Sequence, residues 1–123
     1  MNEEFSGSCL CGAVQLVASG PPVLVAACHC ASCRKHTGAP VAVFVDYARK
    51  DVAFKGEPMA LFESSKGVTR GFCGQCGSTI SYEGDNLPHM IHLHLGVFDD
   101  PTQFQPTANE NTATQFPWLC IRG

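Results

Sequence analysis

Short apolar runs alternate with turn-forming residues along the whole chain, and the turn signals recur about every ten positions. No segment keeps a helical period over about 11 residues, whereas several segments alternate apolar and polar positions. We expect strands at 5–17 with a bend at Gly12, and at 23–27, 41–45, 51–55, 59–65, 68–73, 79–82 and 89–95. The pattern predicts a mainly β fold of antiparallel sheets.

Length and composition fit one domain over residues 1–123. The chain has 123 residues, 45% of them apolar, and no linker-like run interrupts it. Its formal charge is −3 and its longest basic run is Arg34-Lys35, so we expect no nucleic-acid partner. The acidic start at 1–4 leads into no apolar stretch of signal-peptide length, and no span is long enough to cross a bilayer. We therefore expect a cytoplasmic protein with no membrane partner.

The eight cysteines point to metal binding. Cytoplasmic thiols are kept reduced, so metal coordination explains this number better than disulfides do. Cys9-x-Cys11 and Cys73-x-x-Cys76 together supply four thiolates, the ligand set of a closed structural zinc site. On an extended segment Cys9 and Cys11 face the same side, so both sulfurs are expected to reach one ion without a special turn. The alternative is a set of reduced, buried cysteines.

A second cluster, Cys28, Cys30 and Cys33, places three thiols too close in sequence to pair as unstrained disulfides. Three thiolates leave a tetrahedral zinc one ligand short, which is the arrangement of an open, catalytic site. The alternative is a second structural site that Cys120 or a histidine completes. Cys120 lies in the apolar tail 116–121, which we expect to dock on the sheet with the thiol buried.

Two pairs of polar residues are further candidates for a functional site. His92 and His94 share one face of the expected strand 89–95, where they can bind a metal or shuttle a proton near neutral pH. The alternative is that they form the outward polar face of an amphipathic strand. Arg34 and Lys35 directly follow the three-cysteine cluster and can offset its charge or bind an anionic thiol substrate. Their alternative role is that of solvated surface charges.

Four segments carry a family resemblance: Gly-Ser-Cys-Leu-Cys-Gly-Ala-Val at 7–14, Cys-His-Cys-Ala-Ser-Cys-Arg-Lys at 28–35, Arg-Gly-Phe-Cys-Gly-Gln-Cys-Gly-Ser at 70–78 and Gly-Val-Phe-Asp-Asp-Pro at 96–101. They resemble the glutathione-dependent formaldehyde-activating enzyme (GFA) family, which also includes centromere protein V. The resemblance implies a zinc-dependent carbon–sulfur lyase-like protein on a zinc-stabilised β-tent of stacked antiparallel sheets. It implies that the structural zinc ligands are Cys9, Cys11, Cys73 and Cys76, and that the catalytic zinc ligands are Cys28, Cys30 and Cys33.

The resemblance also implies a reaction between a thiol and a small aldehyde. The namesake reaction of the family joins formaldehyde to glutathione as S-(hydroxymethyl)glutathione. We therefore expect two zinc ions per chain and a thiol such as glutathione at the open zinc. Two alternatives are a zinc-stabilised binding module without chemistry and a glutathione carrier without turnover. The oligomeric state stays open, with a homodimer as one option.

Overall fold

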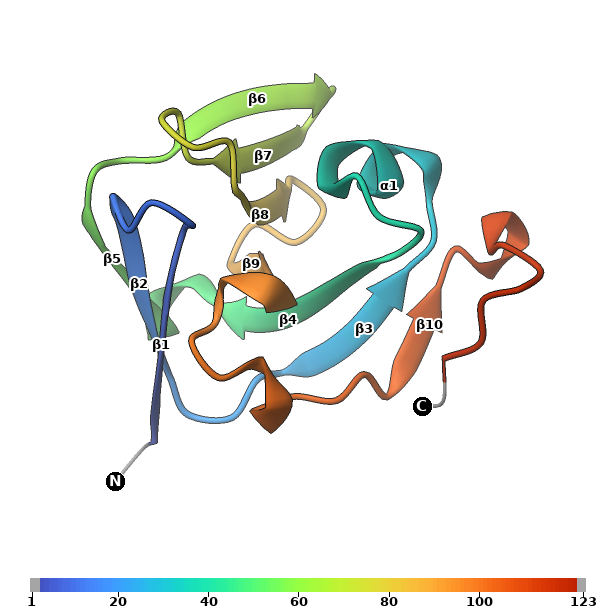
Figure 1. Ribbon diagram of the computed structural model, residues 1–123, viewed down its shortest axis with the longest axis horizontal. Helices are drawn as coiled ribbons and strands as arrows, with labels where there is room; N and C mark the ends of the chain where they lie inside the picture. Colours follow the sequence, from blue (N-terminus) through green and yellow to red (C-terminus); the bar gives the residue numbers. More distant parts are fainter. Residues whose placement is uncertain (1–2, 122–123) are drawn as a thin grey trace.

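The computed structural model describes residues 3–121 and contains two β-sheets and one short helix (Figure 1). The strands are β1 (Glu4–Ser8), β2 (Val14–Ser19), β3 (Leu24–Cys28), β4 (Ala42–Ala48), β5 (Val52–Gly56), β6 (Ala60–Ser65), β7 (Val68–Phe72), β8 (Thr79–Gly84), β9 (Met90–His94) and β10 (Ala108–Glu110). The helix α1 spans Ala31–Thr37, and the 3₁₀ turns are η1 (Arg49–Asp51), η2 (Leu95–Val97), η3 (Pro101–Gln103) and η4 (Thr112–Thr114).

The two sheets differ in size and shape. The smaller sheet has three strands in the order β1-β2-β5, and the larger has seven in the order β10-β3-β4-β9-β8-β7-β6. Neighbouring strands are antiparallel except β10, which lies parallel to β3. Figure 1 shows the larger sheet curving from β6 at the top of the view to β10 near the C-terminus. The prediction of a mainly β fold with antiparallel sheets is confirmed.

The structure corrects three details of the sequence-based prediction. The expected strand 5–17 is two strands, β1 and β2, joined by a turn in which Gly12 has φ of 82°. The sequence pattern missed α1, because a seven-residue helix is too short for its period to show, and it missed the three-residue β10. Within residues 3–121, no helix has the length and apolar character that a membrane crossing requires.

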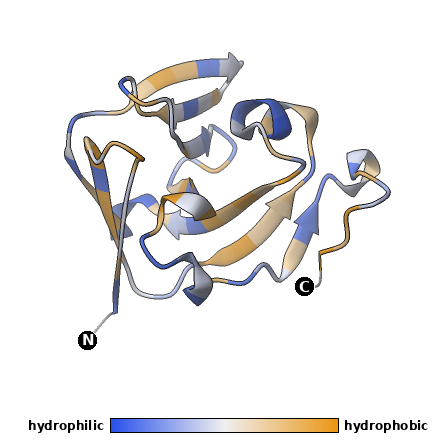
Figure 2. Cartoon of the chain, in the orientation of Figure 1, coloured by the Kyte–Doolittle hydropathy of each residue, from blue (hydrophilic) through white to orange (hydrophobic). Residues whose placement is uncertain are grey.

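The core lies between the two sheets. Val14 and Leu16 point inward from β2, and Val45 of β4 sits opposite Leu93 of β9 in the larger sheet; all four are almost completely buried. Alternation along each strand delivers these apolar side chains to one face, because successive residues of a strand face opposite sides. Much of β3 and β4 is hydrophobic in Figure 2, whereas α1 is largely hydrophilic.

The opposite face of the larger sheet carries polar and aromatic side chains. Asp46 of β4 pairs with His92 of β9, which in turn pairs with Tyr82 of β8, and Tyr82 pairs with Arg70 of β7. Cross-strand partners share a face, so these four side chains form a row across the sheet. The helix α1 connects β3 to β4, and three members of this row, Arg70, Tyr82 and His92, line the same cavity as the cysteines at the start of the helix.

The closing segment does not pack as expected. The prediction that the tail 116–121 docks on the sheet with Cys120 buried is wrong, since Cys120 is exposed and Trp118 is 70% exposed. The apolar face of the larger sheet packs against the smaller sheet. Phe116 instead packs beside α1, with the Arg34 guanidinium carbon 4.5 Å from its ring centroid.

A close backbone contact joins the smaller sheet to the segment after β9. Gly7 of β1 forms an isolated bridge with Phe98, and the Asp99 N–H donates to the Ser6 carbonyl at 2.9 Å. A Cβ on Gly7 would lie 2.5 Å from the Val97 carbonyl oxygen, closer than such atoms can approach. Gly7 is therefore required for the approach of the two segments.

We predict that Gly7→Ala lowers the free energy of unfolding by about 1–3 kcal/mol, because the added methyl group forces the two backbones apart. Urea denaturation measures this loss. The matched control is Gly96→Ala, because a Cβ on Gly96 has no heavy atom within 4 Å. Equal stability of the two variants would contradict the close contact at Gly7.

Candidate functional site

The first cysteine cluster joins two turns that are distant in sequence. Cys9 and Cys11 lie in the turn between β1 and β2, and Cys73 and Cys76 lie in the turn between β7 and β8. The expectation that Cys9 and Cys11 sit on an extended segment is wrong. The chain turns there, with the Gly12 N–H donating to the Cys9 carbonyl at 3.1 Å, and the turn itself brings the two sulfurs together.

The four sulfurs of this cluster have the spacing of a tetrahedral metal site. All four lie within 4.8 Å of one another, with Sγ–Sγ separations of 3.6 Å for Cys9–Cys11 and 3.8 Å for Cys11–Cys73. Zinc–sulfur bonds of about 2.3 Å in a tetrahedron require separations of about 3.8 Å. The Val14 N–H donates to the Cys9 sulfur at 3.3 Å, a contact that stabilises a thiolate. This cluster can therefore bind a metal ion.

The second cluster gathers three sulfurs around the start of α1. Cys28 ends β3, Cys30 is the N-cap residue of the helix and Cys33 lies within it. The three sulfurs lie within 4.8 Å of one another, and the Cys28 and Cys33 sulfurs are 3.5 Å apart. Within residues 3–121 no fourth cysteine, histidine or acidic residue joins them, and Cys120 is exposed elsewhere. This cluster can bind a metal ion through three protein ligands.

The thiols of the second cluster share negative charge. The hydrogen bond with Cys33 lowers the pKa of Cys28 to about 5, and the same contact raises the pKa of Cys33. The proton of this pair is therefore retained by Cys33, and the negative charge lies on Cys28. A group of sulfurs that already carries charge near neutral pH is a suitable ligand set for a borderline-soft metal ion.

A cavity of about 370 Å³, called the thiol cavity below, opens onto the three sulfurs. Its volume is in the range of small-molecule sites. The side chains that give it chemical character, besides the three cysteines, are Phe44, Arg70, Tyr82, His92, Glu110 and Asn111. The sulfurs therefore face a space that a small ligand can enter.

Arg70 is the cation that touches the second cluster. It is only 4% exposed, and its Nη1 and Nη2 atoms lie 3.6 and 3.8 Å from the Cys33 sulfur. Its Nε donates to the Ser64 hydroxyl at 2.9 Å, and its guanidinium carbon lies 5.1 Å from the centroid of the Tyr82 ring. These contacts fix the guanidinium against the sulfur, where its charge favours the thiolate.

Arg34 and Lys35, the basic residues expected to serve this cluster, lie outside the 370 Å³ cavity. Arg34 donates through Nη1 to the carbonyls of His29 and Thr114, each at 2.7 Å, so it fastens the C-terminal segment to the start of α1. Lys35 is exposed and lines the neighbouring cavity described below. Arg70, not these two residues, provides the positive charge beside the sulfurs.

The C-terminal segment supports the cluster from the other side. The Asn111 Nδ2 donates to the Cys28 sulfur at 3.2 Å, and Asn111 adopts a left-handed conformation with φ of 57°. The Asn109 side-chain oxygen lies 2.9 Å from Nε2 of the fully buried His29. Because β10 pairs with β3, these contacts hold the segment against the strand that ends in Cys28.

His92 faces the thiol cavity and has an acidic partner. Its Nδ1 lies 3.2 Å from Asp46 Oδ1, close enough to interact although the two atoms are not aligned as a hydrogen bond. Burial raises the pKa of Asp46 to about 7 and lowers the pKa of His92. Near neutral pH the imidazole is therefore neutral, and the carboxyl group can exchange a proton with it.

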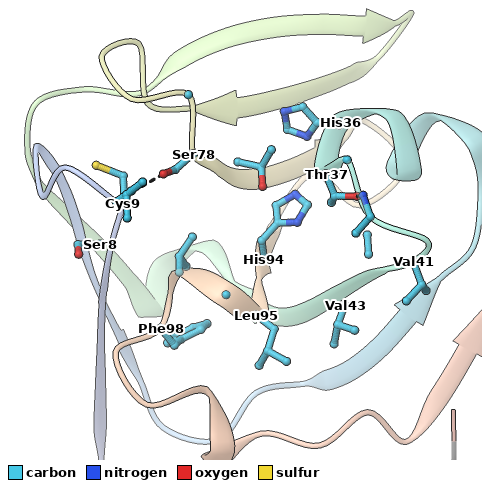
Figure 3. A pocket seen from close by; sticks show the side chains of 18 of the residues that line it. Ser8, Cys9, His36, Thr37, Val41, Val43, Ser78, His94, Leu95 and Phe98 are labelled. Atoms are coloured by element: carbon cyan, nitrogen blue, oxygen red, sulfur yellow. Dashed lines mark hydrogen bonds between the residues drawn. The ribbon is translucent and has the colours of Figure 1, made fainter.

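His94 lies in a different cavity from His92, although both residues are on the same face of β9. It lines a cavity of about 920 Å³ together with His36, and Figure 3 shows the two rings close to each other. Burial, with His36 and Arg70, lowers the pKa of His94 to about 3. The alternative that both histidines form an outward polar face is wrong, because His94 is 5% exposed and the side chain of His92 is 14% exposed.

Comparison with known proteins identifies the family. The family model described as glutathione-dependent formaldehyde-activating enzyme matches residues 4–114. The chain belongs to this family. A protein of Schizosaccharomyces pombe named an uncharacterized lyase is 31% identical to it over 94 residues, which are 75% of this chain and 68% of that protein.

Solved structures support the fold of this family member. The crystal structure of a Rhodobacter sphaeroides protein matches it with a TM-score of 0.67, at 18% sequence identity. The match covers 85% of this chain and 98% of that chain. At this identity the likeness bears on the fold alone.

Arg70, Asn111 and His36 line the two cavities and are not among the site residues predicted from the sequence. Arg70 begins the segment 70–78 that carries part of the family resemblance, so that motif was the available signal. Asn111 and His36 belong to no motif. Their contacts depend on how η4 and α1 pack against β3 and β9, which only the structure reveals.

We predict that Cys73→Ser removes the metal from the four-cysteine cluster and unfolds the domain. The ligands lie 62 positions apart, and a structural zinc of this kind contributes on the order of 10 kcal/mol. Cys30→Ser is expected to lose the other metal ion and keep its fold, because three local ligands close only a short loop. Circular dichroism melts and metal analysis measure both effects. Cys120→Ser is the control, and equal unfolding of the Cys30 and Cys73 variants would contradict the division of roles.

Proposed function

We propose that the protein is a zinc-dependent carbon–sulfur lyase that joins and separates a thiol such as glutathione and a small aldehyde. The observation that carries this proposal is the count of ligands at the second cluster. Three sulfurs meet at a cavity, and no fourth protein ligand joins them within residues 3–121. An incomplete ligand set that faces a ligand-sized space is the arrangement of a catalytic site, whereas a structural site is closed by protein.

The residues of both clusters fit zinc. The sulfur spacings match a tetrahedral zinc site, and thiolate ligands suit this borderline-soft ion. We assign the closed site to Cys9, Cys11, Cys73 and Cys76, and the open site to Cys28, Cys30 and Cys33. When bound at the open site, zinc would supply a Lewis-acid position that favours the thiolate form of an entering thiol.

Proton transfer in this reaction falls to His92. In the forward direction the sulfur–hydrogen bond of the thiol breaks, a sulfur–carbon bond forms, and the carbonyl oxygen takes up the proton as a hydroxyl group. His92 is neutral, lines the thiol cavity and has Asp46 at its Nδ1, so its Nε2 can accept the thiol proton and return it to the oxygen. The reverse direction uses the same residues to release the aldehyde. In this scheme His94 takes no part in the proton transfer.

Arg70 balances the charge of the open site. Three thiolates with one divalent ion carry a net charge of −1, and the guanidinium against the Cys33 sulfur offsets it. Exposed Lys35 stays available for a carboxylate of a substrate such as glutathione, whereas the guanidinium of Arg34 is engaged by backbone carbonyls.

Cobalt substitution tests the open site. We expect that adding glutathione at neutral pH strengthens the thiolate-to-cobalt absorption, because the ligands of one ion change from three sulfurs to four. The change should be absent with S-methylglutathione, which has no thiol proton, and absent in Cys30→Ser. A band that already corresponds to eight sulfurs for two ions before any thiol is added, and that Cys120→Ala weakens, would contradict an open site.

Turnover separates the enzyme from the two alternatives. Exchange NMR of a glutathione and formaldehyde mixture should show faster formation and breakdown of the adduct when the zinc-loaded protein is present. His92→Gln is expected to lower this rate by about 10²–10⁴-fold while the cobalt response to glutathione remains. Thiol binding without acceleration would indicate a carrier, and neither effect would indicate a binding module.

We predict that Arg70→Gln weakens zinc binding at the three-cysteine site about 10- to 150-fold, because a hydrogen bond to a charged group contributes about 1.5–3 kcal/mol. Competition with a chelator measures the affinity of this site, and the metal of the four-cysteine site serves as an internal reference. Arg70→Lys keeps the charge and should recover most of the affinity. The control is Arg49→Gln, which removes a cation whose side chain is 53% exposed, pairs with Glu83 and lines neither cavity. An unchanged zinc affinity of the three-cysteine site in Arg70→Gln would contradict the proposed role of Arg70.

A further inference from the structure

The cavity of about 920 Å³ is larger than the thiol cavity, and the proton transfer proposed above does not involve it. It lies where the end of α1, the end of β9 and the turns that carry the four-cysteine cluster meet. Figure 3 shows the rings of His36 and His94 at one side of it, Cys9 and Ser78 at another, and Val43 and Leu95 below the rings.

Unpartnered imidazole nitrogens mark this cavity as a binding site. His94 is 5% exposed, and its Nε2 has no hydrogen-bond partner among residues 3–121. Both ring nitrogens of His36 also lack a partner in that part of the chain, and the two ring centroids are 5.6 Å apart. A buried polar atom without a partner is costly, so a ligand that hydrogen-bonds to these rings gains affinity.

The charges around the cavity select a neutral ligand. Lys35 and Asp99 are the charged side chains of the lining, one of each sign, and both are exposed. Burial keeps His36 and His94 neutral by lowering the pKa of each, and the nearby Arg70 adds to this effect. The positive charge of Arg70 also opposes a metal cation at the two rings. Because the two exposed charges are of opposite sign and the rings are neutral, the lining has no net charge that selects a small anion or cation at the two rings.

The remaining lining sets the size and the chemistry of the ligand. Val41, Val43 and Leu95 offer apolar surface beside the two rings. Each neutral imidazole has one N–H donor and one acceptor nitrogen. A short alkyl group with a carbonyl oxygen, or with the hydroxyl groups of a hydrated carbonyl, matches both features.

We infer that this cavity binds a small neutral carbonyl compound through hydrogen bonds from His94 and His36 to its oxygen. The identity of that compound as the aldehyde substrate rests on the proposed function. The two cavities are neighbours, because Phe44 lines the thiol cavity and its ring centroid lies 4.6 Å from that of His94. This cavity would therefore hold the carbonyl compound next to the thiol cavity, in which His92 acts, before the reaction. His36 also follows Cys33 by one turn of α1. A neutral imidazole is the form that polarises a carbonyl group by donating its N–H.

Histidine NMR on the zinc-loaded full chain tests the inference directly. Four probes of similar size are titrated: propionaldehyde, the unreactive propionamide, propionate and propylammonium. We expect propionaldehyde and propionamide to shift the imidazole signals of His36 and His94, and the two charged probes to bind at least fivefold more weakly. The signal of exposed His89 should not move. Preferred binding of propionate or propylammonium, or no shift with any probe, would overturn the inference.

Single substitutions locate the binding site. His94→Phe and His36→Phe retain a ring and remove its hydrogen-bonding nitrogens, so each is expected to weaken propionamide binding about 3- to 10-fold. His89→Phe is the matched control and should leave the affinity unchanged. Unchanged affinity in both cavity variants would overturn the inference. The cobalt response to glutathione distinguishes failure of the carbonyl site from failure of the proposed function. If the protein binds no carbonyl compound but the cobalt response remains, only the carbonyl site is contradicted and the proposed thiol chemistry is not.

Discussion

Four sulfurs that converge from two distant turns are the constraint on which the rest of this structure depends. The turn between β1 and β2 belongs to the smaller sheet, and the turn between β7 and β8 belongs to the larger. Among residues 3–121, the other backbone contacts between β1 and the segment after β9 are the isolated bridge of Gly7 with Phe98 and the hydrogen bond from the Asp99 N–H to the Ser6 carbonyl. A metal ion on the cluster would hold the two sheets together at one end of the hydrophobic core, to which Cys9 and Cys73 also belong. The cavity of about 920 Å³ is lined in part by the same two turns.

The second cluster obtains its geometry differently, from local structure and from one distant segment. Cys30 is the N-cap of α1 and its sulfur accepts the Cys33 N–H at 3.3 Å, so the fold of the helix itself brings two of the sulfurs together. Asn111 and Arg70 then contact the Cys28 and Cys33 sulfurs from the C-terminal segment and from β7. This arrangement fixes three sulfurs without providing a fourth, which is what distinguishes the cluster from its four-cysteine counterpart.

The sequence predicts the three-cysteine cluster well because its spacing is a local property. Cys28, Cys30 and Cys33 are close in space for the same reason that they are close in sequence, and strand alternation likewise places His92 and His94 on one face. The charge partner of the sulfurs could not be found this way. Arg34 and Lys35 are neighbours in sequence, but the helix turns them away, whereas Arg70 arrives from another strand through the order of the sheet.

Phe44 of β4 packs against both histidines of this strand face. Its ring centroid lies 6.1 Å from that of His92 and 4.6 Å from that of His94, and it is almost completely buried. His92 remains beside the sulfurs with an acidic partner, whereas His94 is left with an imidazole neighbour and no acid. The same neutral ring is thus suited to moving a proton in the first environment and to donating a fixed hydrogen bond in the second. The partner of each ring, which comes from β4 in one case and from α1 in the other, decides between the two roles.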